Sequence, residues 1–217
     1  MRTIVLIASL LAVLTLLCGC RDAPETPLAI AAAAGRAGEV ADLLSAGAEV
    51  DAVDADGTTA LVWAARFGQV VSMEVLIAAG ADVDLRCGSN AWTPMMHAIH
   101  KHHAAAAVEL LDAGASVDGR AGAKALTMAA GYGNVELTRA LLAAGVEPHD
   151  QMLTDAVGGR WDIDYRFSGC ETHTETVRAL IESSPGLRVP DDLWGRMAVR
   201  YASKQGCDEM LELISQS

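Results

Sequence analysis

One short phrase recurs four times in this chain: Ala46-Gly47-Ala48-Glu49-Val50-Asp51, AGADVD at 79–84, AGASVD at 113–118 and AGVEPH at 144–149. Its glycines, at positions 47, 80, 114 and 145, lie 33, 34 and 31 residues apart. A period near 33 indicates a stacked repeat protein, in which no single unit can bury its apolar face alone. Such folds usually bind other proteins through an extended surface and seldom catalyse reactions.

The clearest copy of the repeated unit spans residues 59–84. Residues 59–68 predict a short helix that ends at Gly68, which can adopt the left-handed conformation after the last turn. Residues 69–79 predict a second helix with one apolar side, ending before Gly80. Residues 82–84 then form an extended finger that leads to the next unit.

The opening of each unit resembles the ankyrin repeat, whose helices begin with T-P-L-H-x-A. The matching segments are TPLAIA at 26–31, TALVWA at 59–64, TPMMHA at 93–98 and, more loosely, KALTMA at 124–129. The resemblance covers residues 26–148. It implies an all-α fold, an ankyrin repeat solenoid of five to six helix-turn-helix units with β-hairpin-like fingers.

The domain prediction follows from this register. The fifth unit departs from the pattern because it contains extra residues, and the last unit is expected to close the stack as an atypical cap. The predicted segments are 1–19 (signal peptide), 20–25 (tether), and a 26–217 ankyrin domain with units 26–58, 59–92, 93–123, 124–150, 151–190 (insertion 158–173) and the 191–217 cap.

The first twenty residues have the pattern of an export signal. Arg2 precedes a mainly apolar run from Ile4 to Leu17, which is short for a membrane span but suits a secretory signal. The following Leu17-Cys18-Gly19-Cys20 resembles a bacterial lipobox, which implies cleavage before Cys20 and lipidation of Cys20. An ordinary cleaved signal or an uncleaved anchor is the alternative. The resemblance implies a lipoprotein that faces the periplasm, on the outer rather than the inner membrane because Arg21 follows the cysteine.

The net charge of −12 bears on the possible partners. Nucleic acids and anionic lipid surfaces are recognised by basic fields, so neither is expected to bind here. Lipid chains on Cys20 would hold the protein at the bilayer without a basic patch. We expect a monomer that needs no cofactor.

Three cysteines remain if Cys20 is lipidated. Cys170 and Cys207 are expected near the inter-helix turns of adjacent units, where an oxidising periplasm would permit a disulfide. Cys87, in the finger between the second and third units, is predicted to be a free thiol or an intermolecular site.

The ankyrin resemblance also implies a binding face, formed by the finger tips and the first helix of each unit. Aromatic and arginine side chains on an exposed face are typical interface anchors. Some aromatic residues at these positions are often half-buried in the family, so they are expected to divide between surface and core. The predicted partner-binding residues are Arg66, Phe67, Arg86, Trp92, Lys101, Arg120 and Tyr132, with Trp161 and Tyr165 in the insertion.

Two groups of residues suggest an alternative function. His97, His100, His102 and His103 crowd one predicted turn, and clustered imidazoles can bind zinc or copper. Asp162 and Asp164 in the insertion could act as an acid–base pair. A metal-binding or hydrolytic periplasmic protein would use one of these groups. However, no nearby cysteine or carboxylate completes a ligand set, and no known catalytic motif occurs.

The sequence therefore predicts a non-enzymatic, protein-binding lipoprotein without metal. Two roles are open: an immunity protein that neutralises a toxin or enzyme, or a scaffold that supports a periplasmic enzyme. An acidic surface suits a basic partner and speeds its capture.

Overall fold

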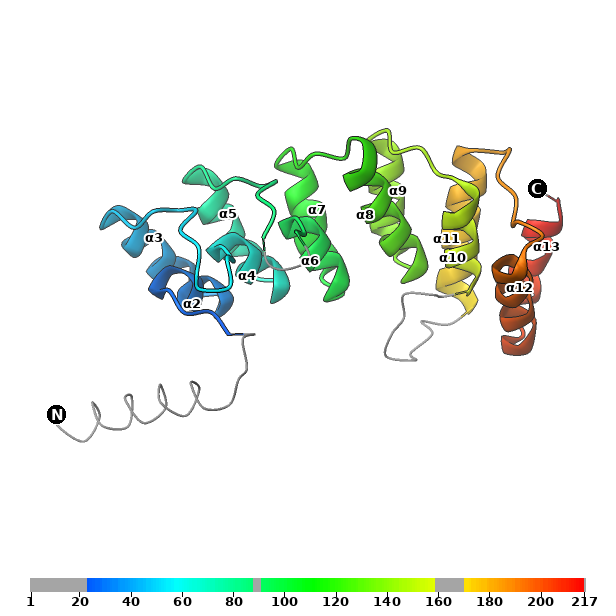
Figure 1. Ribbon diagram of the computed structural model, residues 1–217, viewed down its shortest axis with the longest axis horizontal. Coiled ribbons are helices and arrows are strands. Elements are labelled where there is room, and N and C mark those ends of the chain that lie inside the picture. Colours follow the sequence, from blue (N-terminus) through cyan, green and yellow to red (C-terminus); the bar gives the residue numbers. More distant parts are fainter. Residues whose placement is uncertain (1–22, 88–90, 159–169, 217) are drawn as a thin grey trace.

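Helix pairs stacked in a single curved row form the described part of the molecule (Figure 1). The computed structural model describes residues 23–87, 91–158 and 170–216. Within these ranges every regular element is a helix, and two isolated antiparallel bridges, Val53–Thr59 and Cys87–Trp92, close the first two fingers. The predicted all-α solenoid is confirmed.

The first helix of each unit packs on the first helix of the next, and the second helices do the same, so the row has two layers. None of the described helices is long and apolar enough to span a bilayer. The pairs are α2 (Pro27–Ala33) with α3 (Ala37–Ser45), α4 (Ala60–Arg66) with α5 (Val70–Ala78), α6 (Pro94–His100) with α7 (Ala104–Asp112), α8 (Gly119–Gly131) with α9 (Val135–Ala143), α10 (Asp150–Gly158) with α11 (Cys170–Ser183), and α12 (Leu193–Gln205) with α13 (Asp208–Gln216).

A threonine fixes the start of each of the first three units. The Oγ1 atoms of Thr26, Thr59 and Thr93 accept hydrogen bonds from the backbone N–H three residues later, at 3.1, 3.4 and 3.4 Å. Such a cap satisfies one of the donors that the first turn of a helix leaves free. In α2 and α6 a proline follows the threonine, at a position where its missing N–H costs nothing.

The fourth unit lacks this start signal, and its first helix is longer. Lys124 stands where the first three units have threonine, and the segment before it, GRAGA at 119–123, is helical as well. Accordingly α8 begins at Gly119, five residues before the predicted unit boundary at Lys124. Arg120 therefore lies in the first turn of α8.

The aspartate that ends the repeated phrase links neighbouring fingers. The carboxylate of Asp51 accepts hydrogen bonds from the backbone N–H of Asp82 at 3.1 and 3.2 Å. The carboxylate of Asp84 accepts in the same way from Ser116, at 3.0 and 3.1 Å. Successive units are thus joined along the finger edge as well as through the helix layers.

The fifth unit differs from its predicted outline. Gly158 belongs to α10, and α11 begins at Cys170, so both ends of the predicted insertion 158–173 are helical. Cys170 and Cys207 form a disulfide, with sulfur atoms 2.06 Å apart and a sequence separation of 37. This bond ties the start of α11 to the residue that precedes α13.

Candidate protein-binding surface

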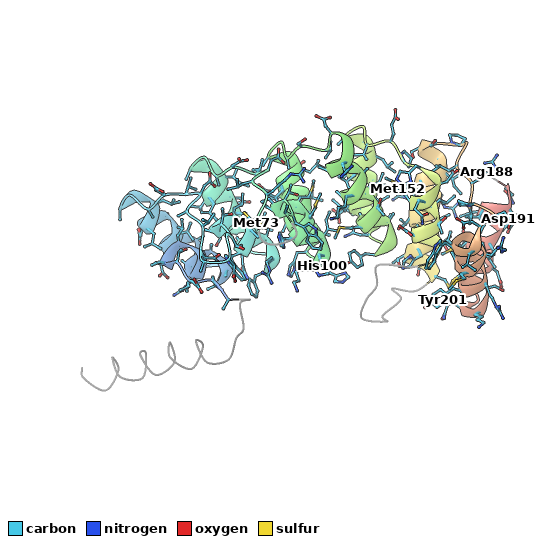
Figure 2. All side chains as sticks on the ribbon, in the orientation of Figure 1. Met73, His100, Met152, Arg188, Asp191 and Tyr201 are labelled. Carbon is cyan, nitrogen blue, oxygen red and sulfur yellow. A yellow bond between two sulfur atoms is a disulfide. The ribbon has the colours of Figure 1, made fainter. Side chains whose placement is uncertain are left out.

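Aromatic and basic side chains gather where α4, α6 and α8 lie side by side. We call this group the aromatic–basic patch. It consists of the exposed Phe67 and Lys101 and the half-buried Arg66, Trp92, His100 and Lys124. Figure 2 shows His100 at the edge of the row where the first helices end, the same edge that carries Tyr201 of α12.

The part of the patch contributed by α4 rests on a fixed base. Trp63 is buried, and its Nε1–H donates to the carboxylate of Asp54 at 2.7 Å. The guanidinium carbon of Arg66 lies 4.5 Å from the centre of the Trp63 ring, within cation–π range. Phe67 stacks beside the same ring at 6.2 Å and is 47% exposed. Arg66 and Phe67 therefore rest on the Trp63 side chain, which burial and its hydrogen bond hold in place.

Trp92 is the centre of the patch. Its ring lies edge-on to those of His97 and His100, at 5.4 and 5.2 Å between centroids. The ammonium nitrogen of Lys124 in α8 lies 5.0 Å from the Trp92 ring. The Cys87–Trp92 bridge holds the backbone on either side of the finger. Trp92 thus joins a finger to two successive first helices.

Tyr132 supports the patch from below and is not part of its surface. It is only 7% exposed, because His100 and His102 cover it. The Tyr132 hydroxyl and His100 Nδ1 are 3.0 Å apart, and the His102 ring lies 4.5 Å from the Tyr132 ring. Tyr132 is therefore not exposed, as a partner-binding residue was predicted to be.

Burial and neighbouring cations keep the histidines of the patch neutral. Burial, together with the nearby Arg66, His100 and Lys101, lowers the pKa of His97 to about 4. The pKa of His100 is lowered in the same direction, first by burial and then by Lys101, His102 and Arg66. At pH 7 the patch therefore carries its positive charge on arginine and lysine, with neutral imidazoles between them.

The four histidines of the turn do not converge on one point. His100 contacts Tyr132, His102 lies against the Tyr132 ring, and the His103 ring lies so close to Gly68 that no Cβ would fit there. Within residues 23–87, 91–158 and 170–216, no group of three or more His, Cys, Asp or Glu side chains could hold a metal ion. Asp162 and Asp164 lie outside the described residues, as do Trp161, Tyr165 and Cys20.

The remaining predicted residues are less closely joined to the patch. Arg86 is exposed next to Cys87, and Arg120 is exposed on α8. Cys87 is a free cysteine, and burial raises the pKa of its thiol. A buried thiol of this kind is a poor intermolecular disulfide site, since the thiolate is the reactive form.

A second exposed apolar surface lies on α12. It is formed by one stripe of this helix, and the spacing of its members was the sequence signal that could have found them: Leu193, Trp194, Met197 and Tyr201. All four are exposed, and Trp194, Met197 and Tyr201 line a cavity of about 210 Å³ between α12 and α10. The sequence also missed Lys124, because its side chain reaches the patch only through the packing of α8 on α6.

The family assignment rests on a sequence model of ankyrin repeats in three copies, which matches residues 6–87 and 74–152. The chain belongs to the ankyrin repeat family. A comparison with the curated proteins gave no match.

Solved ankyrin structures share the fold along nearly the whole chain. An ankyrin repeat domain from Acinetobacter baumannii AYE is 28% identical, with a TM-score of 0.69, and the match covers 87% of this chain and 96% of that one. The ankyrin repeat protein EF0377 is 27% identical, with a TM-score of 0.68 and coverage of 89% and 99%. A chain in the complex of the predatory endopeptidase Bd0816 from Bdellovibrio bacteriovorus with the immunity protein Bd3460 has a TM-score of 0.65 over 90% and 100% of the two chains. At 20% identity it shows the shared fold alone.

Proposed function

We propose that this protein binds a partner protein through the aromatic–basic patch and performs no chemistry itself. Ankyrin repeats are protein-interaction domains, and the chain has the repeats over most of its length. The observation that carries the proposal is the patch itself. Neighbouring units present the exposed Phe67 and Lys101 together with the half-buried Trp92. Aromatic and cationic side chains on an exposed face are the usual anchors of protein interfaces.

The patch is suited to rigid recognition. Trp63, Asp54 and Tyr132 hold its members from below, so few side-chain rotations are lost when a partner binds. The net charge of −12 over the whole chain favours a partner whose surface is basic outside the contact made by the patch.

We further propose that the partner is met in the periplasm, by a lipoprotein anchored through Cys20. The support is the lipobox-like Leu17-Cys18-Gly19-Cys20 after an apolar run. Within that compartment the roles that fit are immunity against a toxin or enzyme and support of a resident enzyme. The Bd0816 complex supports the first role, because a chain of the same fold occurs in an assembly that contains an endopeptidase and an immunity protein.

The test is affinity capture from periplasmic extract with the acyl-free chain over residues 21–217, followed by titration of the captured protein. Phe67→Ala combined with Lys101→Ala should weaken binding at least tenfold, because both side chains are exposed anchors. Val71→Ala is the matched control, since Val71 is an exposed apolar residue of α5, in the other helix layer. A partner that binds the Phe67/Lys101 variant as tightly as the parent would contradict the proposed surface.

A further inference from the structure

The last unit leaves a groove at the open end of the solenoid. One side of α12 packs on α10 and one side of α13 on α11, as in every earlier unit, while no further described unit covers their other sides (Figure 1). Val189, Val199 and Leu211 are half-buried members of a groove of about 890 Å³ between α12, α13 and the segment before them. Terminal repeats usually present a polar outer face to water, so apolar side chains there require an explanation.

Basic side chains border this groove. Arg196, Arg200 and Lys204 are spaced by four residues and form one stripe of α12, and Arg188 stands opposite on the preceding segment. Asp191 is the one acidic residue among those lining the groove, so the lining carries four positive charges and one negative, a net +3. The whole chain carries −12, from 16 basic and 28 acidic residues. The groove is therefore opposite in sign to the molecule that contains it.

Little of this positive charge is neutralised within the protein. Arg196 pairs with Asp191 at 3.0 Å, but the Asp191 side chain is 93% exposed, and ion pairs in water contribute little. Arg200 and Lys204 are exposed and form no ion pair within the part of the chain that the structure describes. Figure 2 places Arg188 and Asp191 at the C-terminal end of the row, away from the aromatic–basic patch.

We propose that this end groove binds an acidic amphipathic helix of a partner protein, laid across α12 and α13 in the place of a next unit. The apolar side of such a helix would cover Val199 and Leu211, as the helices of each unit cover those of the unit before. Its carboxylates would meet Arg196, Arg200 and Lys204, and arginine can bind a carboxylate through two parallel hydrogen bonds. This surface is separate from the aromatic–basic patch, so either can exist without the other.

A lipid surface is a weaker match for the groove. The first described unit, α2 and α3, lies at the opposite end of the row from α12 and α13 (Figure 1). An anchor on Cys20, close to α2 in sequence, would attach the protein to the bilayer at the end of the row opposite the groove.

The test uses the full chain in mild detergent and two fluorescein-labelled helical peptides. One carries Glu at every fourth position beside a stripe of Leu, and the other has Gln in place of Glu. The Glu peptide should bind at least tenfold more tightly by fluorescence anisotropy, with an affinity that falls as salt is added. The variant Arg196→Ala/Arg200→Ala/Lys204→Ala should lose at least tenfold. The control Arg36→Ala/Arg120→Ala/Arg139→Ala should not, because it removes the same charge at exposed positions outside both surfaces.

Charge reversal provides a test that does not depend on loss of binding. Arg200→Glu combined with Lys204→Glu should bind a peptide with Lys in place of Glu, with an unchanged circular dichroism spectrum. Equal binding of the Glu and Gln peptides, or equal loss in the control triple variant, would overturn the proposal. Capture by anionic vesicles in preference to the Glu peptide would overturn it in favour of lipid. A shift from dimer to monomer on mutating the groove would overturn it in favour of a second copy.

Discussion

His97 shows how one half-buried side chain shapes the aromatic–basic patch. It packs against Trp92 in the centre of the patch, and its Nε2 is buried without a hydrogen-bond partner in the described structure. Protonation would place a charge in this site beside Arg66 and Lys101, which is why its pKa falls to about 4. The neutral ring can therefore serve as packing for Trp92 at physiological pH.

The lowered pKa of His97 makes stability depend on pH. In the unfolded chain the pKa of this group is near 6.5, so between pH 6.5 and 4 the unfolded state binds more protons than the folded state. Stability is then fully present above pH 6.5 and is lost as the pH falls toward 4, by about 3 kcal/mol at 1.36 kcal/mol per pKa unit. Urea unfolding of the parent and His97→Gln at pH 7, 5.5 and 4 measures this loss of stability.

The control for this prediction is His149→Gln, which replaces an exposed histidine. Carboxylates also titrate in this range, but their contribution is common to all three proteins. As the pH is lowered, the free energy of unfolding should therefore fall less steeply in His97→Gln than in the parent or the His149 variant. Identical pH profiles for the three proteins would show that His97 is not held neutral by folding.

Single residues also mark where the sequence analysis succeeded and failed. Phe67 and Lys101, which directly follow the last turn of a short first helix, are exposed as predicted. Tyr132 occupies the corresponding position in the fourth unit, yet His100 and His102 of the third unit cover it. That burial depends on two histidines some 30 residues away. A repeat register locates a side chain in its own unit and does not show what the adjacent unit places over it.

The helices show the same division between local and distant information. The starts of α2, α4 and α6 could be predicted from threonine caps, which act within three residues. α8 starts early and lacks such a cap. The absence of a cap is a weaker sequence signal than its presence, and the repeat pattern obscured it. The start of α11 at Cys170 was not predicted, although the pairing of Cys170 with Cys207 was expected.

The Cys170–Cys207 disulfide should stabilise the end of the row and leave the beginning unchanged. Its closed loop of 37 residues corresponds to about 3–4 kcal/mol in the chain-entropy model. Each unit contacts only its neighbours, so the effect should be local. In Cys170→Ala/Cys207→Ala, hydrogen exchange should accelerate in α12 and α13 and remain unchanged in α2 to α5.

The matched control is Cys87→Ala, which removes a buried cysteine near the other end of the row. Its effect on hydrogen exchange should be confined to the second and third units. Uniform acceleration through all helices of the Cys170/Cys207 variant would mean that the solenoid unfolds as one cooperative body, contrary to this prediction.

The whole molecule is an acidic row with surfaces of different chemistry along it. The aromatic–basic patch lies over α4, α6 and α8, and the end groove lies between α12 and α13. A solenoid can carry such independent surfaces because each is built by neighbouring units alone. The proposed anchor at the opposite end would leave both accessible to partners.

The anchor can be tested on the whole protein. Only six residues lie between Cys20 and Pro27, the start of α2, so a lipidated Cys20 would keep the start of α2 within about 25 Å of the bilayer at roughly 3.3–3.6 Å per residue. Cys20→Ser should move the protein from the membrane fraction to the soluble fraction, because acyl chains and not surface charge would hold it there. Cys18→Ser, which changes the neighbouring cysteine and keeps Cys20, should stay in the membrane fraction and retain the mass of the attached lipid. If instead the Cys20 variant remained membrane-bound, the apolar segment from Ile4 to Leu17 would be an uncleaved anchor. The solenoid would then be held by its leader and not by lipid.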